Sequence, residues 1–306
     1  MSDRKALRLG PVEWALLVFL SVLWGGSFFF VEVIVEELPA FTLVLGRVGI
    51  AAAVLWILIL AGGGRVPREA RAWRDFLVMG ALNNVAPFAL IAWAQTYMGG
   101  GLAAIINAST PLWTVIFASF MTTDEKATAL KVAGVLVGMA GVAAIVGPAA
   151  LGLSGEGLLP PLAIVAATIL YGYTSVFGRR LRSFEPILAA AGQLTAATLV
   201  AAPLVVLLEQ PWSLPMPSGA AIAALLGLAV LSTALAYAVY FRILNTAGAT
   251  NVILVTLLVP ISAVLLGAAF LGERLEPRAF VGMALVAAGL ALIDGRLVRR
   301  MLGGRG

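Results

Sequence analysis

The sequence contains neither cysteine nor histidine, and only 11% of its 306 residues are charged. Without cysteine the chain forms no disulfide and has no thiol to act as a nucleophile or metal ligand. Without histidine it lacks the commonest metal ligand and the side chain that most often moves protons near neutral pH. A soluble domain carries about 25% charged residues, so the polar surface that water requires is also missing. We therefore expect no cofactor, no metal site, and a lipid bilayer around the protein.

Apolar residues make up 61% of the chain and gather in segments of about 20 residues, the length of helix that spans a hydrocarbon layer. Breaks rich in glycine, proline and charge separate the segments. The first segment is too long for the apolar core of a cleaved signal peptide. We predict ten transmembrane helices, at 12–34, 40–61, 76–96, 100–121, 129–147, 159–179, 185–208, 219–241, 247–271 and 278–294.

The basic residues are sorted between alternate connections of these segments. All but three of the 20 lysines and arginines lie at the two termini or in every second loop. Lys and Arg are retained on the cytoplasmic side during insertion, so we predict that both termini are cytoplasmic. The exceptions are Arg47, inside the second segment, and Arg274 and Arg278, in a loop predicted to be outside. The net charge of +5 then reflects orientation and attraction to anionic headgroups, and no nucleic acid partner is expected.

The second half of the chain repeats the first, with 101–145 aligned on 250–293. Chance similarity between helices rich in Gly, Ala and Leu is the alternative. Since each repeat holds five helices, an odd number, the second enters the membrane inverted. We predict an all-α membrane protein of two inverted-topology repeats, 12–147 and 158–294. The matched positions are Pro111 with Pro260, Asp124 with Glu273, Gly134 with Gly282, Gly141 with Gly289, Trp24-Gly25 with Tyr171-Gly172, and Gly46-Arg47 with Gly192-Gln193.

Inverted repeats have a mechanical meaning. Two halves of one shape and opposite orientation can exchange conformations, so that a central site opens first to one face of the membrane and then to the other. This symmetry serves a transporter and is of little use to an enzyme. The repeat therefore predicts a membrane transporter that works by alternating access.

Several motifs resemble a known family. They are Trp24-Gly25-Gly26-Ser27-Phe28, Arg47, the stretch 101–111, and Gly272-Glu273-Arg274-Leu275. In this order, over nearly the whole chain, they resemble the EamA type of the drug/metabolite transporter superfamily. The resemblance implies a ten-helix secondary transporter of the bacterial inner membrane, and the subgroup most similar exports aromatic amino acids. Asp124 and Gln193 depart from the family pattern, which has Glu and a basic residue there, so the two halves are not expected to play equal roles.

Polar and aromatic residues in the middle of the segments are candidates for a substrate site, because a membrane helix holds polar side chains only where they face protein or water. An aromatic cavity with a few amides suits a substrate with a flat apolar body and a polar end. Anchoring at the headgroups and contacts between helices are the alternative roles. Trp93 and Tyr237 are expected to be counterparts across the repeat. The candidate substrate-binding residues are Trp24, Ser27, Phe28, Asn83, Asn84, Trp93, Asn107, Tyr171, Tyr237, Tyr240 and Asn251.

Two prolines and one ion pair have further predicted roles. Pro111 and Pro260 each remove a backbone hydrogen bond and bend a helix, which predicts hinges, with shaping of the bundle as the alternative. Arg47 is the one basic residue inside a predicted span, and Glu32 is its expected partner near the outer end. This pair is interpreted either as structural or as an outer gate. A third interpretation makes Arg47 the counter-ion of a substrate carboxylate.

The fifth and tenth segments carry glycines at nearly regular spacing and almost no polar residue in mid-span. Their glycines are Gly134, Gly138, Gly141, Gly282 and Gly289. Small residues of this kind let helices pack closely, so we place both helices outside the core. A homodimer contact is the alternative use of these faces.

The expected function is export of small metabolites, most of all amino acids and related amphiphiles, at a central aromatic-lined cavity. Exchange of sugar phosphates or nucleotide sugars needs several basic residues in the cavity, and the chain supplies only Arg47. A membrane enzyme needs a nucleophile with a base, or clustered carboxylates, and mid-span is nearly free of titratable groups. An exporter of drugs or flat cations, and a channel, are further alternatives. Because the acids lie near the ends of the segments, downhill or loosely coupled export without a buried proton relay is expected.

Overall fold

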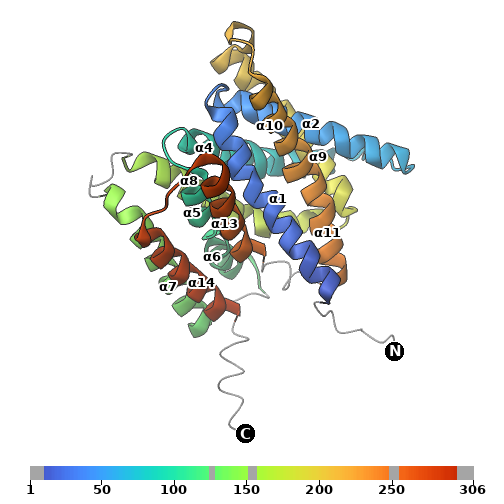
Figure 1. The fold of residues 1–306 in the computed structure, drawn as a ribbon. Coiled ribbons are helices and arrows are strands. Elements are labelled where there is room, and N and C mark those ends of the chain that lie inside the picture. The colour runs from blue at the N-terminus through green and yellow to red at the C-terminus, as the bar shows by residue number, and fades with distance from the viewer. Residues whose placement is uncertain (1–9, 124–127, 151–156, 248–254, 295–306) are drawn as a thin grey trace, which may run out of the picture.

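A computed structural model describes residues 10–123, 128–150, 157–247 and 255–294 (Figure 1). These residues form helices and connecting loops, and no strand is found among them. Asn251, one of the predicted site residues, and Asp124 lie outside the described residues. The helices of the first half are α1 (Pro11–Val35), α2 (Ala40–Ala61), α3 (Ala70–Met79), the π-helical turn η1 (Gly80–Val85), α4 (Ala86–Gln95), α5 (Gly100–Asn107), α6 (Thr110–Met121) and α7 (Ala129–Ala150).

The second half has a similar series of helices. It comprises α8 (Leu159–Phe177), the 3-10 turn η2 (Gly178–Leu181), α9 (Pro186–Leu204), the π-helical turn η3 (Val205–Glu209), the 3-10 turn η4 (Pro211–Ser213), α10 (Gly219–Ala229), the π-helical turn η5 (Val230–Leu235), α11 (Ala236–Ala247), α13 (Val255–Leu266), the π-helical turn η6 (Gly267–Leu271) and α14 (Pro277–Asp294).

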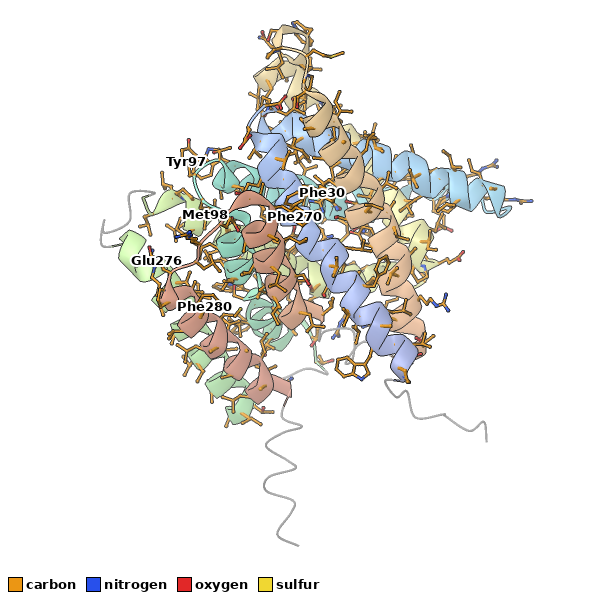
Figure 2. The ribbon with its side chains drawn as sticks, viewed as in Figure 1. Phe30, Tyr97, Met98, Phe270, Glu276 and Phe280 are labelled. Carbon is orange, nitrogen blue, oxygen red and sulfur yellow. The ribbon has the colours of Figure 1, made fainter. Side chains whose placement is uncertain are left out.

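Seven helices of the described chain are long and apolar enough to cross a bilayer, and three more apolar helices are shorter: Ala129–Ile145, Leu258–Leu271 and Pro277–Ile293. Many large apolar side chains point outward, such as Phe120, 83% exposed, and Phe270, 70% exposed. Phe280 of α14, labelled in Figure 2, is 48% exposed. In water such a surface would be unfavourable, whereas lipid solvates it. The chain is therefore a multi-pass membrane protein.

Three predicted segments differ from the helices found. The third begins at Ala70 instead of 76, and two arginines, Arg71 and Arg74, lie in its added turn. The fourth is divided at Ala108 and Ser109 into α5 and α6. The third and eighth contain the π-helical turns η1 and η5 in mid-segment. Pro87, which has no N–H to bond back to the carbonyl of Asn83, accounts for the first π-helical turn; no proline accounts for the second.

The helix pair α7 and α14 packs together at one side of the molecule, at the lower left of Figure 1. Their glycines meet face to face, so that a Cβ built on Gly134 would lie 2.6 Å from the carbonyl oxygen of Gly289. A Cβ on Gly141 would likewise lie 2.7 Å from the carbonyl oxygen of Gly282. The predicted use of these glycines in close packing thus occurs within one chain, and the same glycine faces are not open to a second copy.

The other helices pack around a centre formed by both halves. Helix α1 packs against α13 and against α10 and α11, while α8 packs against α6 and against α4. Helices α2 and α9 lie against each other. The buried residues of the largest apolar cluster come from both halves, for example Leu20, Ile105 and Ile164. The polar residues discussed next lie among these helices.

Polar ties join the two halves at one end of the molecule. The carboxylate of Glu209, at the end of η3, accepts hydrogen bonds from the backbone N–H groups of Phe41 (2.8 Å) and Thr42 (2.6 Å) at the start of α2. The carboxylate of Glu37 accepts from the backbone N–H of Ser218 (2.6 Å) just before α10. Both contacts connect loops that the charge pattern assigns to the outside, so we refer to this as the outer end.

Candidate functional site

A buried arginine lies between the two halves of the bundle. Arg47 of α2 is 9% exposed, and its Nε donates to the hydroxyl of Thr233 in η5 at 3.0 Å. The guanidinium carbon lies 3.6 Å from the centroid of the Phe88 ring of α4. Arginine stacks well on aromatic faces because its planar cation is weakly hydrated. Thr233 and Phe88 therefore fix the position of a charge in the interior.

Tyr237 of α11 joins Arg47 to two amide side chains. The guanidinium of Arg47 lies near the hydroxyls of Tyr171 and Tyr237. The Nε2 of Gln193 donates to the hydroxyl of Tyr237 at 3.3 Å, and the amide of Asn84 faces the same hydroxyl. We call these residues the central cluster: Arg47, Asn84, Phe88, Tyr171, Gln193, Thr233 and Tyr237. It combines a cation, two amides and three rings from helices of both halves.

Several buried amide atoms of the central cluster have no hydrogen-bond partner among the described residues. Asn84 is fully buried, and both its Oδ1 and its Nδ2 are unpaired. Gln193 is 6% exposed, and its Oε1 is unpaired. An unsatisfied buried polar group destabilises a fold by about 1–3 kcal/mol, so each such group needs an explanation. The central cluster thus holds donors and acceptors that the described protein does not use.

Two further predicted residues, Trp24 and Tyr240, pack against each other. The rings of Trp24 in α1 and Tyr240 in α11 are 5.6 Å apart between centroids, with an angle of 36° between their planes. Both side chains are partly buried and pack against the main apolar cluster. We call Trp24 and Tyr240 the aromatic pair. It presents apolar surface contributed by helices of both halves.

The remaining predicted residues have more local roles. Asn83 accepts a hydrogen bond from the Thr174 hydroxyl at 2.8 Å, which ties η1 to α8. Ser27 donates to the backbone of Trp24 at 2.6 Å, within α1, and Phe28 is 6% exposed in the apolar core. The Oδ1 of Asn107, at the end of α5, is buried and has no hydrogen-bond partner in the described part of the chain. The hydrogen bonds of Asn83 and Ser27 agree with the alternative role of polar residues in a membrane helix, which is to stabilise the helices and not to bind substrate.

Trp93 does not lie with the central cluster. It is 37% exposed, and its ring centroid lies 5.2 Å from that of Tyr97 near the end of α4. Phe88 takes the position expected for a counterpart of Tyr237. The sequence alignment places Gln193 over Arg47, and Phe88 lies against Arg47 just as Tyr237 lies against Gln193.

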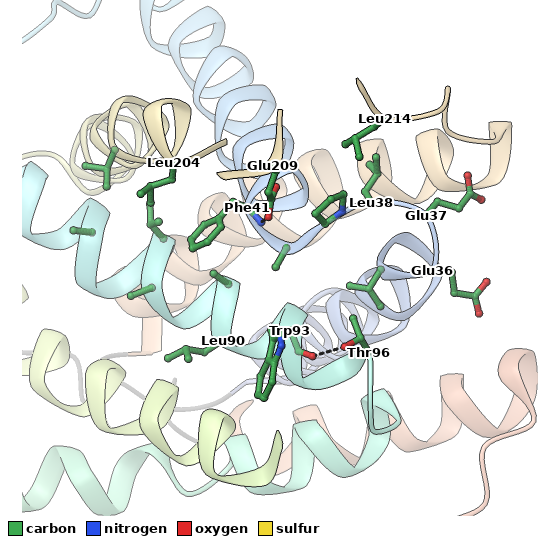
Figure 3. A pocket seen from close by; sticks show the side chains of 18 of the residues that line it. Glu36, Glu37, Leu38, Phe41, Leu90, Trp93, Thr96, Leu204, Glu209 and Leu214 are labelled. Atoms are coloured by element: carbon green, nitrogen blue, oxygen red, sulfur yellow. Dashed lines mark hydrogen bonds between the residues drawn. The ribbon is translucent and has the colours of Figure 1, made fainter. Parts of the chain in front are cut away.

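Trp93 lines an outer cavity of about 930 Å³, shown in Figure 3 between the α1–α2 loop, α4 and the end of α9. Its walls are mainly apolar. Three acids line this cavity: Glu36, Glu37 and Glu209. Glu37 accepts a hydrogen bond from Ser218, and Glu209 accepts one from the backbone at the start of α2. Only Glu36 makes no hydrogen bond within the described chain. The outer cavity therefore offers few polar groups that could orient a substrate, and the central cluster is the stronger candidate site.

The structure corrects the expected pairing of Glu32 with Arg47. Glu32 accepts a hydrogen bond from the backbone N–H of Gly100 at 2.8 Å, at the first turn of α5. Glu273 accepts from the next N–H, that of Gly101, at 3.0 Å, and its carboxyl lies within hydrogen-bonding reach of Glu32. The N-terminus of a helix attracts anions, and α5 draws Glu32 away from Arg47. These contacts tie α1 to the segment after η6, at the outer end.

The two predicted hinge prolines have different surroundings. Pro111 is the second residue of α6 and directly follows the break at Ala108 and Ser109. Pro260 lies inside the continuous helix α13. A helix end tolerates proline, whereas a helix interior loses a hydrogen bond to it. A discontinuity is therefore seen only beside Pro111, and hinge motion at either proline stays a prediction.

Sequence reasoning missed Phe88 as a site residue because an apolar ring within an apolar helix carries no signal. Gln193 did carry one, since it aligns with Arg47 across the repeat. The pairing of Glu32 with Glu273 joins distant parts of the chain, and periodicity within a helix does not reveal it. Within the described ranges no three acidic side chains lie together as a metal ion requires.

Comparison with known proteins identifies the family. The model of the EamA-like transporter family matches residues 12–147 and again residues 158–294. The probable terminal-alkyne amino-acid exporter of Streptantibioticus cattleyicolor is 26% identical over 295 residues, covering 96% of this chain and 97% of that protein. Protein PecM of Dickeya dadantii is 27% identical over 283 residues, 90% of each chain. The uncharacterized transporter YoaV of Bacillus subtilis is 19% identical over 278 residues, 90% of this chain and 94% of that protein.

A solved structure, described only as the crystal structure of a protein, has the same fold. It superposes with a TM-score of 0.67 at 22% identity and covers 94% of this chain and 97% of its own. The names of the family and of these relatives indicate a transporter and not an enzyme. Because the family model matches both halves of the sequence, this chain belongs to the EamA-like transporter family of the drug/metabolite transporter superfamily.

Proposed function

We propose that the protein exports small metabolites, most of all neutral amino acids with apolar side chains, across the bacterial inner membrane. Both termini lie in the cytoplasm in this proposal, as the distribution of Lys and Arg predicts. The observation that carries it is the central cluster, which gathers a cation, amides and aromatic rings from both halves in the middle of the bundle. A relative described as a probable amino-acid exporter, similar along 96% of this chain, supports the substrate class.

The proposal includes ten membrane-spanning helices in two inverted repeats, and glycine contacts support this symmetry. A Cβ on Gly25 would lie 2.7 Å from Ser262, and one on Gly172 would lie 2.5 Å from Trp113. In the sequence alignment Gly25 corresponds to Gly172, and Ser262 corresponds to Trp113. Exchanging the halves therefore converts one contact into the other.

Two more pairs of contacts follow the same exchange. Gly134 meets Gly289 and Gly141 meets Gly282, and the alignment converts each of these pairs into the other. Helix contacts agree, since α1 with α13 corresponds to α8 with α6. Two halves related in this way can rock about the central cluster, which exposes it to one face at a time.

Flux measured with purified protein in liposomes tests the function. Radiolabelled L-phenylalanine, L-leucine and L-threonine are loaded, and efflux is followed as the internal concentration rises. We expect efflux that saturates with concentration and is several-fold slower in Trp24→Ala and Tyr237→Ala. Trp212→Ala is the matched control, because Trp212 is 69% exposed in a loop. Flux that rises without saturation indicates a channel, and absence of flux for every amino acid tested contradicts the proposal.

A further inference from the structure

Among the described residues, no carboxylate balances the charge of Arg47. The salt bridges of the described residues involve Arg74 and Arg278, both near helix ends, and no carboxylate contacts Arg47. A buried ion without a counter-ion is strongly destabilising. The guanidinium has five N–H donors, and within the described chain only Nε has a protein acceptor, the hydroxyl of Thr233. The terminal nitrogens of Arg47 therefore remain available to an anion.

The groups around Arg47 complement the rest of an amino-acid head group. Asn84, fully buried, has an amide that faces Tyr237 but makes no hydrogen bond of regular geometry within the described residues, and the carbonyl oxygen of Gln193 is unpaired there as well. Gln193 donates to the hydroxyl of Tyr237, the amide of Asn84 faces it, and Arg47 interacts with it electrostatically, so the three side chains are arranged around one tyrosine. A carboxylate would accept from Arg47 and Asn84, and an ammonium would donate to the two carbonyl oxygens.

We propose that Arg47 binds the carboxylate of the transported molecule, with Asn84 and Gln193 binding its amino group. The aromatic pair Trp24–Tyr240, in which Tyr240 lies one helical turn beyond Tyr237 on α11, contacts its apolar body. This inference rests on the proposed export function and assigns its substrate to zwitterions and carboxylates. Organic cations are excluded, because the buried guanidinium repels them in a medium of low dielectric constant. The alternative is that Arg47 has only a structural role, with its position held by Phe88 and Thr233. In that case the charge of the ligand does not change its affinity.

Ligand pairs that differ only at the carboxylate test the assignment on the unaltered protein. Binding of radiolabelled L-phenylalanine to the purified protein in nanodiscs is competed with L-phenylalanine, 3-phenylpropionate, L-phenylalanine amide and phenethylamine. We expect the two carboxylates to compete at least about tenfold better than the amide and the amine, because charge-assisted hydrogen bonds to arginine are lost with the carboxylate. Equal competition by the acid and its amide overturns the assignment.

Two variants separate a ligand role of Arg47 from a structural one. Asn84→Asp places a carboxylate at Tyr237, within the central cluster that holds Arg47, so we expect a higher melting temperature together with loss of L-phenylalanine binding. Arg47→Gln removes the preference for the acid over its amide, and Arg47→Lys retains part of it. Arg182→Gln, a change at an exposed arginine, is the control and retains the preference. If Asn84→Asp raises the melting temperature while binding and the acid preference stay unchanged, Arg47 is structural and the assignment falls.

Flux measurements distinguish the absence of a carboxylate site from the absence of export. Saturable flux of L-phenylalanine, its amide and phenethylamine at equal rates leaves an exporter but removes the carboxylate site. No flux of any of these compounds, or of the amino acids tested above, removes the exporter function and the carboxylate site with it.

Discussion

Two glycines, Gly25 and Gly172, lie where neighbouring helix backbones touch. At Gly25 an added Cβ would lie 2.8 Å from the backbone nitrogen of Ala263, and at Gly172 it would lie 2.8 Å from the backbone carbonyl carbon of Trp113. Backbone atoms cannot move aside as a flexible side chain does. These residues therefore set the separation between α1 and α13 and between α8 and α6, which decides how closely the halves meet.

Gly25→Ala is expected to lower stability by about 1–3 kcal/mol, the usual range for overpacking. For a chain of this size that corresponds to a fall of several degrees in melting temperature, about 2–4 °C for each kcal/mol. Thermal unfolding in detergent, followed by intrinsic fluorescence, gives the measurement. Gly219→Ala is the matched control, since a Cβ there meets nothing within 4 Å. Equal melting temperatures for the two variants would contradict this packing role.

The loop residue Glu37 provides a pH-dependent tie at the outer end. Its hydrogen bonds from the hydroxyl and N–H of Ser218 lower the pKa of its carboxyl below the usual value of 4.5. A carboxyl whose folded pKa is depressed stabilises the fold above its unfolded pKa, and this contribution is lost as the pH falls through the folded pKa. We expect Glu37→Gln to melt below the wild type at pH 7 and the difference to shrink below about pH 4.5.

Melting curves of the detergent-solubilised protein between pH 3 and pH 7 measure this effect. Glu36→Gln is the control, because Glu36 is also exposed but makes no hydrogen bond within the described residues. A difference between Glu37→Gln and the wild type that stays constant with pH would show that this carboxylate does not contribute through its charge.

At the scale of elements, hydropathy located seven long apolar helices and three shorter ones among the described residues, because a helix in lipid must satisfy its own backbone hydrogen bonds. It did not predict the interruptions. The break at Ala108 and Ser109, with Pro111 following, and the π-helical turn at Gly80–Val85 before Pro87 each lie beside a proline that the sequence displays. The turn at Val230–Leu235 has no such signal. This turn carries Thr233, which accepts a hydrogen bond from Arg47 of α2. A contact between helices that are distant in the chain cannot be deduced from the local sequence.

Four residues of the central cluster could be picked out from the sequence, and their role in binding substrate stays a prediction. Arg47, Asn84, Tyr171 and Tyr237 stand out because polar groups are rare in apolar helices, and the structure brings them together. Which face of each helix meets the others depends on rotation about its axis, which composition does not fix. Trp93 is the example, since it lies at the outer cavity and not beside Tyr237.

Pro111→Ala is expected to slow transport several-fold while binding of L-phenylalanine stays nearly unchanged. Proline at the start of α6 prevents α5 and α6 from joining into one helix, because it lacks the N–H that continues the hydrogen-bond ladder. Alanine allows the two to join and stiffens the element. Flux in liposomes and binding in nanodiscs are compared. Pro277→Ala is the control, since Pro277 is the first residue of α14, where no helical hydrogen bond is lost. If Pro111→Ala and Pro277→Ala transport at the same rate, Pro111 does not act as a hinge.

At the scale of the whole molecule, the absence of cysteine makes the topology directly testable. Ser183 and Ser213 are exposed in loops that the charge pattern places inside and outside, respectively. In intact cells a membrane-impermeant maleimide is expected to label Ser213→Cys and to leave Ser183→Cys unlabelled until the membrane is opened. No native thiol competes, so the result is unambiguous. The reverse pattern inverts the molecule and converts the proposed export into uptake.

Alternating access also predicts that the outer end must open during each cycle. Glu37 and Ser218 belong to different halves and are hydrogen-bonded there, so a cross-link between them should hold the outer end closed. We expect Glu37→Cys with Ser218→Cys, joined by a short reducible bis-thiosulfonate, to lose transport and to regain it on reduction. Each single cysteine variant, treated in the same way, controls for the modification itself. If the cross-linked protein transports at the rate of the single variants, the two halves do not separate at the outer end, and substrate must cross without the rocking motion that the inverted repeats predict.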